Sequence, residues 1–268
     1  FDPAISPIKL MNPISEDLSV MRTSLVPGLL QALIHNLNRQ RQRVCLFETG
    51  LIFLEDKTEI NQKAVLGMIC SGRSQIENWA NESRIADFFD IKGHLEEIFT
   101  LTGSLSEFTF GENRRDGFHP GQTARIFRGG KTVGWVGAIH PELASSLGVE
   151  IPILAAEIDM DAILESRLPL FEEVSKFPEI RRDIALLIDK AVTAEQVMSL
   201  VRSVAGDKLI DLSLFDLYSG EGIDSKRKSI AIGLTFCDRS STLKDEDVTA
   251  AVDVLIESLK KKFAAELR

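Results

Sequence analysis

The sequence predicts an α+β protein of two domains, and three observations support this. Residues 1–166 contain many short apolar runs and few helical ones, which is typical of an antiparallel sheet with helices packed on it. Residues 177–268 follow the order strand, helix, strand, strand, helix, strand, the order of a ferredoxin-like βαββαβ domain. Residues 167–176, with a proline and two adjacent glutamates, are the expected linker.

Helical spacing of apolar side chains places two long helices in the first domain. The first is expected over residues 25–39, with a start signal at Ser24 and Pro27. The second is expected over residues 87–101, and a short third helix begins at Pro141. Strands are expected over residues 44–47, 51–54, 64–70, 123–127, 132–139 and 153–158, with a hairpin turn at 128–131.

Period-two alternation assigns the two faces of the second sheet. In the strand 229–236 the even positions are bulky and are expected to face the helices, whereas the odd positions are small and face outward. The middle strand contains the adjacent apolar pair Leu214 and Phe215, which predicts a one-residue bulge. Such a bulge turns Phe215 and Leu217 inward and leaves Asp216 and Tyr218 outward.

The face without helices is expected to form a shallow floor of small residues with polar residues at its edge. The floor comprises Ala185, Ala231 and Gly233, and the edge comprises Asp216, Tyr218 and Ser229. A floor without bulk admits a flat base, and open sheet faces commonly bind single-stranded RNA. Tyr218 offers a ring for stacking, and Asp216 and Ser229 offer hydrogen bonds to base edges.

Charge is distributed unevenly along the chain. The net charge is −9, but residues 176–268 hold 15 basic and 16 acidic side chains and are nearly neutral. Strong non-specific phosphate binding is therefore not expected. Any RNA contact is expected to be local and made in company with another subunit.

Composition indicates a globular protein, with 44% hydrophobic and 26% charged residues. No run reaches transmembrane length and no signal peptide is present, so no membrane contact is expected. Three cysteines far apart, without CxxC spacing, are expected to be reduced core thiols of a cytoplasmic protein. The chain begins at Phe1 rather than Met and is expected to be part of a longer one.

Short motifs in a fixed order carry a resemblance to a known family. They are residues 11–13 (MNP), 21–29 (MRTSLVPGL), 46–50 (LFETG), 87–93 (DFFDIKG) and 119–121 (HPG) in the first domain, and 177–183 (FPEIRRD), 214–220 (LFDLYSG), 226–229 (KRKS) and 242–248 (TLKDEDV) in the second. Over essentially its whole length the chain resembles the β subunit of bacterial-type phenylalanyl-tRNA synthetases.

The resemblance implies a non-catalytic, class II synthetase-like core over residues 1–166 and an anticodon-binding domain over 177–268. It implies anticodon contacts by Asp216, Tyr218, Ser229 and Ala185, the last on spacing alone. RNA-backbone candidates are Arg181, Lys226, Arg227 and Lys228. It further implies an (αβ)2 heterotetramer with an α subunit that uses ATP and Mg²⁺ to charge tRNA-Phe. This part of the β subunit is expected to bind no cofactor and no DNA.

No complete active site is predicted in this chain. Arg125 and Arg128 lie on the predicted hairpin, but no glycine-rich strand ending in arginine follows them. The four histidines are scattered, and a metal site is not expected. Three alternatives stay open: a ferredoxin-like regulatory module that binds a small amino acid at a domain interface, a core that is itself a ligase, and a purely structural assembly piece.

Overall fold

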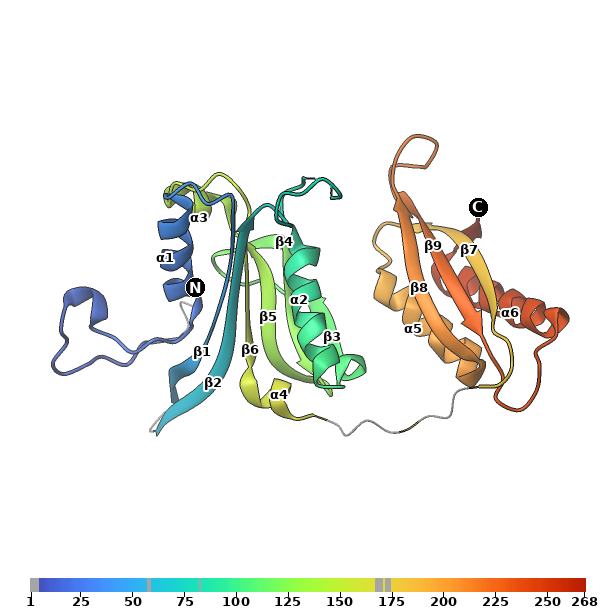
Figure 1. The fold of residues 1–268 in the computed structure, drawn as a ribbon, viewed down its shortest axis with the longest axis horizontal. Coiled ribbons are helices and arrows are strands. Elements are labelled where there is room, and N and C mark those ends of the chain that lie inside the picture. The colour runs from blue at the N-terminus through green and yellow to red at the C-terminus, as the bar shows by residue number, and fades with distance from the viewer. Residues whose placement is uncertain (1–4, 57–58, 82, 167–170, 172–174) are drawn as a thin grey trace. The chain divides into compact units, whose positions relative to one another are not determined.

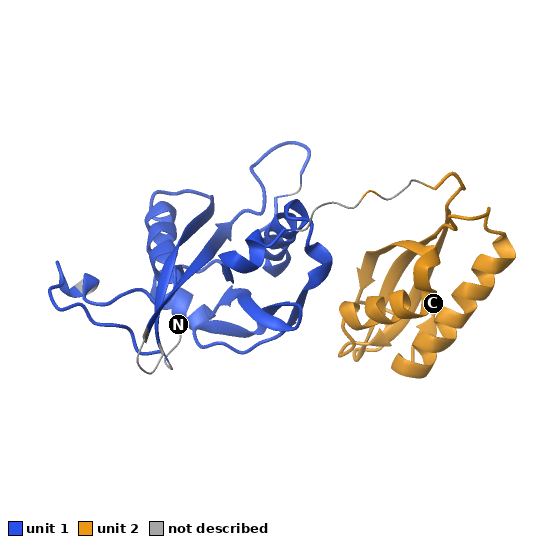
Figure 2. Ribbon diagram, turned by 90° about the horizontal axis from the view of Figure 1, so that it is seen from below, with its two compact units in different colours: residues 1–170 blue, residues 171–268 orange. Residues whose placement is uncertain are grey.

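The computed structural model describes residues 5–56, 59–81, 83–166, 171 and 175–268. The chain forms two compact units, residues 1–170 and 171–268 (Figure 2). Most of the predicted linker, 167–170 and 172–174, lies outside the described residues.

Unit 1 is a six-stranded antiparallel sheet between two layers of helices (Figure 1). In sheet order its strands are β1 (Arg43–Asp56), β2 (Glu59–Gly72), β6 (Ile153–Asp159), β5 (Lys131–Ile139), β4 (Phe118–Arg128) and β3 (Phe108–Glu112). Helices α1 (Val26–Leu37) and α3 (Pro141–Ser146) pack on one face. Helices α2 (Phe88–Leu101) and α4 (Met160–Leu164) pack on the other. Short 3-10 turns lie at Glu16–Leu18 and Leu105–Glu107.

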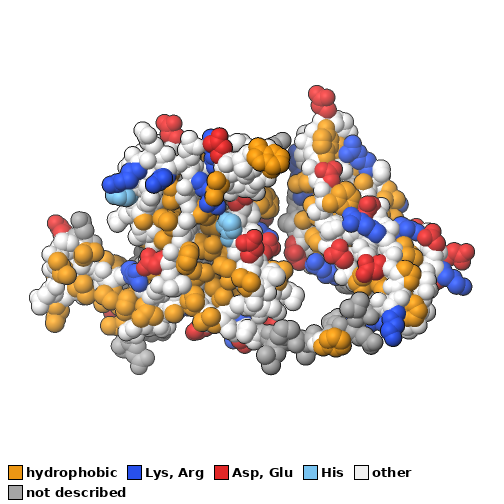
Figure 3. All heavy atoms as spheres, in the orientation of Figure 1, with side chains coloured by type: hydrophobic (Ala, Val, Ile, Leu, Met, Phe, Trp, Pro, Cys, Tyr) orange, Lys and Arg blue, Asp and Glu red, His pale blue; other side chains and the backbone are white. Residues whose placement is uncertain are grey.

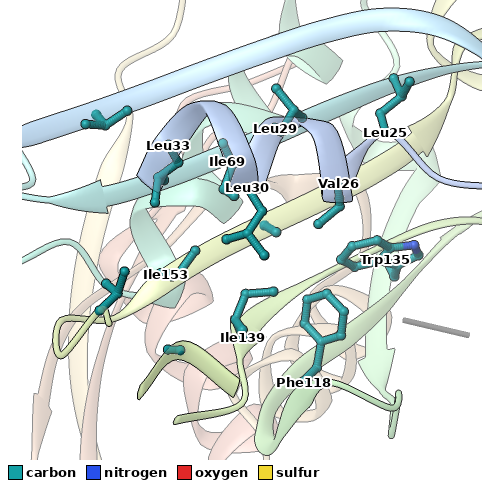
Figure 4. Packing of buried hydrophobic residues seen from close by; sticks show 14 of the residues in the cluster. Leu25, Val26, Leu29, Leu30, Leu33, Ile69, Phe118, Trp135, Ile139 and Ile153 are labelled. Carbon is teal, nitrogen blue, oxygen red and sulfur yellow. The ribbon is translucent and has the colours of Figure 1, made fainter. Parts of the chain in front are cut away.

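Helix α1 packs tightly on the sheet through its predicted apolar stripe (Figure 4). Leu29, Leu30 and Leu33 are buried against strands β2, β5 and β6. Close approach depends on Gly67 of β2, where a Cβ atom would lie 2.9 Å from the Cβ of Leu25. The helical spacing of apolar residues predicts this helix, and the structure confirms it. A glycine in the facing strand allows the helix to lie close to the sheet.

Helix α2 starts where the sequence indicated. Asp87 is its N-cap, accepting a hydrogen bond from the Phe89 N–H at 2.8 Å, and Asp90 closes a capping box. Ile91, Leu95 and Phe99 of this helix are buried.

Two local predictions were wrong. Residues 44–54 form one continuous strand rather than two, because the Thr49-Gly50 pair lies within β1. Arg22 lies over Gly50 there, and a Cβ at that position would meet the Arg22 Nη2 at 2.3 Å. Thr242 followed three residues later by Asp245 predicts a capping box at the start of the last helix. The helix begins later instead: its N-cap is Lys244, without a side-chain cap, and three acidic residues fill its first turn.

A buried carboxylate connects the sheet to the start of α1. Glu157 on β6 accepts hydrogen bonds through its Oε2 from the Ser24 hydroxyl at 2.8 Å and the Leu25 N–H at 2.7 Å. Burial raises the pKa of Glu157, and these hydrogen bonds oppose the shift without cancelling it. Glu157 thus accepts hydrogen bonds from the Leu25 N–H and the Ser24 hydroxyl at the N-terminus of α1, which would otherwise lack this partner in the core.

Replacing Glu157 by glutamine is expected to change how stability depends on pH. The pKa of a glutamate in the unfolded chain is about 4.3, and folding raises the pKa of Glu157 above that value. The stabilising contribution of the protonated acid is fully present below the unfolded-state pKa and is lost as the pH rises through the folded-state pKa. The wild type should therefore lose stability relative to Glu157→Gln between pH 4 and neutrality. Urea unfolding at several pH values measures this difference. A constant difference across that range would contradict the role given to the charge.

Unit 2 has the predicted ferredoxin-like order. Its elements are β7 (Ile180–Asp189), α5 (Ala194–Ala205), β8 (Leu209–Tyr218), β9 (Arg227–Phe236), α6 (Asp245–Phe263) and β10 (Glu266–Leu267), with a 3-10 turn at Gly206–Lys208. The antiparallel sheet has the order β10-β7-β9-β8, and both long helices pack on one face of it (Figure 1). The opposite face is the surface described below, termed the open face.

Among the described residues, no helix is both long enough and apolar enough to cross a membrane.

Candidate nucleic-acid interface

Strand register arranges the predicted site residues in rows across the open face. Ala185 on β7 pairs with Ala231 on β9, which pairs with Asp216 on β8. The next row contains Leu187, Ser229 and Tyr218, and the preceding one contains Asp183, Gly233 and Ser213. Directly paired residues point to the same side of a sheet. The structure therefore brings Ala185, Asp216, Ser229 and Tyr218 together on one continuous surface.

The predicted bulge in β8 is present, and it sets this arrangement. Register shifts between Leu214 and Asp216, so Phe215 is the extra residue. Without this shift, Asp216 and Tyr218 would face the helices. The predicted orientation of Phe215 was wrong: it is 53% exposed, and the Arg181 guanidinium lies 5.7 Å from its ring on the open face. Leu217 has the inward register but is 59% exposed, because it lies outside the core cluster beneath the helices.

Tyr218 is held in a defined position while keeping 39% of its surface exposed. Its hydroxyl donates a hydrogen bond to the Glu221 carbonyl at 3.1 Å. Gly220 is required beside it, since a Cβ there would lie 2.6 Å from the Tyr218 hydroxyl oxygen. The hairpin after β8 thus orients the ring before any ligand arrives, which lowers the entropic cost of stacking.

Sequence reasoning missed Arg268. Its backbone N–H donates to the Ala185 carbonyl at 3.0 Å, and its guanidinium carbon lies 5.4 Å from the centre of the Tyr218 ring. Arg268 follows β10, and its side chain reaches from that edge of the sheet toward β8. The sequence hinted at this position only through the last strand of the predicted ferredoxin-like order. That strand, β10, is two residues long, which is too short to show a periodic pattern.

The four side chains predicted to contact the RNA backbone have different surroundings. Arg181 lies on the open face and pairs with Asp183 at 2.9 Å. Arg227 is engaged with Glu266 at 2.7 Å and with the Leu187 carbonyl at 2.8 Å. Lys226 is exposed.

Lys228 has the register of the helix-covered side, because it precedes Ser229 and pairs with Ile188 of the core. Its Nζ donates to the Lys190 carbonyl at 3.1 Å, and burial lowers its pKa. Figure 3 shows acidic and basic side chains intermixed on the visible surface of unit 2, as its near-neutral composition predicted.

In unit 1, Arg128 is a structural residue. It is only 9% exposed, and its guanidinium pairs with Glu107 at 2.8 Å and donates to the carbonyls of Ala162 and Glu165. Its planar group also lies 5.3 Å from the Phe108 ring. An arginine occupied in this way joins β4 to α4 and is not available to a phosphate. Arg125, by contrast, is exposed and donates to Asn113 at 3.2 Å.

Removing the Arg268 side chain is expected to weaken RNA binding moderately. A cation near an aromatic ring contributes about 0.5–1 kcal/mol at exposed sites, and a guanidinium also attracts phosphate. Arg268→Gln should therefore raise the Kd for a single-stranded RNA probe by about two- to tenfold. Fluorescence anisotropy measures this, with Arg202→Gln as the control, because Arg202 is an exposed arginine of helix α5 on the helix-covered side of the sheet. Equal effects of the two substitutions would contradict a specific role for Arg268.

Fold and site together define an α+β protein with an open-faced ferredoxin-like domain, and comparisons with known proteins agree. Residues 1–160 match the family described as phenylalanyl tRNA synthetase beta chain CLM domain, and residues 175–268 match the ferredoxin-fold anticodon binding domain. The chain belongs to the phenylalanyl-tRNA synthetase beta chain family.

Similar relatives match this chain over nearly its whole length. The phenylalanine–tRNA ligase beta subunit of Pseudomonas syringae pv. tomato is 46% identical over 269 residues, which cover 100% of this chain and 34% of the relative. Those of Shewanella oneidensis and Pseudoalteromonas translucida are 44% and 42% identical, over 97% and 99% of this chain and 33% and 34% of the relatives. The chain therefore spans about a third of the length of these curated relatives.

Proposed function

We propose that this chain is the part of a phenylalanine–tRNA ligase β subunit that supports subunit assembly and reads the anticodon of tRNA-Phe. Catalysis, with ATP and Mg²⁺, takes place in an α subunit within an (αβ)2 heterotetramer in the cytoplasm. The observation that carries this proposal is the open face, where a floor of small residues is bordered by Asp216 and Tyr218 in a domain of the anticodon-binding family.

Each residue of the open face has a distinct part in this proposal. The Ala185 and Ala231 floor lets a base lie close to the sheet, and Tyr218 stacks on it, a contact worth about 1–3 kcal/mol per base. Asp216 accepts hydrogen bonds from base N–H groups, and its negative charge disfavours phosphate at the same position. Ser229 is only 6% exposed, so its hydroxyl belongs to the floor rather than the rim.

Contacts with the RNA backbone are assigned to the basic side chains that are accessible on the surface. Arg181, on the open face, and Lys226, exposed in the hairpin, are the side chains best placed to meet phosphates. Arg227 and Lys228 are engaged with carbonyl oxygens of the same domain and act first as structural residues. Few available cations imply a weak dependence of affinity on salt.

The assembly role falls to unit 1. An apolar groove between α1 and α3 is lined by Pro27, Leu30, Ile34, Leu143 and Leu147. Hydrophobic side chains also gather over β1 and β2 (Figure 3), where Phe47 is largely exposed. Exposed apolar surface of this kind marks protein interaction sites and supports contact with an α subunit.

The experiment that tests the proposal is an amide NMR titration of the whole chain with a tRNA-Phe anticodon stem-loop. Shift changes are expected at open-face residues of β7, β8 and β9, including Ala185, Asp216 and Ser229, and not in α5 or α6. Changes centred on the helices or on unit 1 would contradict the assignment of the face. The absence of any change at saturating RNA would contradict anticodon reading by this chain.

A further inference from the structure

Two thiols and an imidazole from three separate elements of unit 1 converge beside α2. Cys45 on β1 lies directly opposite Cys70 on β2 in the antiparallel register. Opposed residues project to the same face, and Cys70 belongs to the core cluster beneath α2, so both thiols lie on the α2 side. His94 of α2 completes the group, and the three potential ligand atoms all lie within 4.8 Å of one another.

This convergence differs from the sequence expectation of scattered core thiols without a metal site. The cysteines are 25 positions apart in the chain, and only the register of two long strands makes them neighbours. Cys70 is buried, whereas Cys45 is exposed on β1, the outermost strand of the sheet order. His94 keeps 39% of its side-chain surface exposed, so an ion from solvent has a path to the group.

We propose that Cys45, Cys70 and His94 bind a thiophilic divalent metal ion, with Zn²⁺ as the expected occupant. Two sulfurs and one imidazole nitrogen are ligands that zinc takes in proteins, and Cys₂His sets occur with a fourth position for water. Tetrahedral geometry with Zn–S near 2.3 Å and Zn–N near 2.0–2.1 Å places the ligand atoms about 3.5–3.8 Å apart. The spacing found here requires only a small inward movement of these side chains.

The Cys45 and Cys70 thiols are close enough to hydrogen-bond to each other. Cysteine binds a metal as the thiolate, so both thiols must give up a proton to the solvent, and metal uptake should release protons.

Strands β1 and β2 are already hydrogen-bonded to each other along their length. A bound ion would therefore chiefly anchor helix α2 to both strands, and thereby stabilise unit 1. The stabilisation grows with the ratio of free ion to Kd. This site is distant in sequence from the open face and belongs to a different unit, so the inference is independent of RNA binding.

The test is a titration of the reduced, metal-free chain with CoCl₂, followed by displacement with ZnCl₂. One Co²⁺ should bind per chain and give two kinds of absorption band, thiolate-to-cobalt charge transfer and visible d–d transitions. Zinc should displace the cobalt and abolish both. Cys45→Ser and His94→Gln should weaken binding by more than about tenfold, since even loss of an outer partner costs 10–100-fold. Matched controls are Cys237→Ala in unit 2 and the exposed His35→Gln, which should bind as the wild type does.

Folding of each variant is checked by its metal-free thermal unfolding, and ZnCl₂ should raise the Tm of the wild type but not that of Cys45→Ser. Two results would overturn the proposal. One is no thiolate–cobalt absorption with the wild type. The other is cobalt binding that Cys45→Ser and His94→Gln leave unchanged, which would place the ion elsewhere.

Discussion

Replacing Tyr218 by alanine is expected to weaken binding of the tRNA-Phe anticodon stem-loop by about 5- to 150-fold, the equivalent of 1–3 kcal/mol. The substitution removes the ring that faces Arg268 above the alanine floor. Fluorescence anisotropy with a labelled stem-loop measures the change. Because Tyr218 is partly exposed and lies at the end of β8, the domain should remain folded.

Tyr218→Phe is the matched control for this experiment. It keeps the ring but removes the hydroxyl that donates to the Glu221 carbonyl. If stacking is the main contribution, Tyr218→Phe should lose far less affinity than Tyr218→Ala. Equal losses would instead assign the effect to the conformation of the hairpin, and unchanged affinity in both variants would contradict a contact with RNA.

Arg128→Met is expected to destabilise unit 1 by about 3–5 kcal/mol, because it breaks a largely buried ion pair. Glu107 would lose its ion pair with Arg128, and the carbonyls of Ala162 and Glu165 would lose the hydrogen bonds that Arg128 donates. Urea or thermal unfolding of the chain measures the loss in the unit 1 transition.

Arg125→Met, three residues earlier on the same strand, is the control for Arg128. Arg125 is exposed, and surface substitutions usually change stability by no more than about 0.5 kcal/mol. A small effect at both positions would show that the Arg128 contacts contribute little. RNA affinity of any Arg128 variant that remains folded should be unchanged, since this residue has a structural role in unit 1.

Much of the fold could be predicted because its signals are local. Helical spacing defined α1 and α2, and alternation in β9 separated the core side from the floor of small residues. The bulge in β8 was predictable because Leu214 and Phe215 are adjacent and apolar. The side taken by Phe215 was not, since it depends on Arg181 of another strand.

The features that escaped prediction depend on long-range register. Arg268 reaches the open face only because β10 pairs with β7. Cys45 and Cys70 become neighbours only because β1 and β2 pair over their whole length. Burial of Glu157 beside the start of α1 likewise joins positions more than a hundred residues apart. Pattern reasoning along the chain gives no signal for such contacts.

The measurement that tests the central claim most directly is the ratio of affinities for two stem-loops, one with the native tRNA-Phe anticodon and one with the same bases scrambled. Base-specific reading by Asp216 predicts at least a tenfold preference, about 1.4 kcal/mol, for the native loop. It also predicts that Asp216→Ala lowers this ratio toward one while binding to the scrambled loop stays nearly unchanged. Equal affinities of the wild type for both loops at moderate salt would contradict reading of the anticodon by the open face.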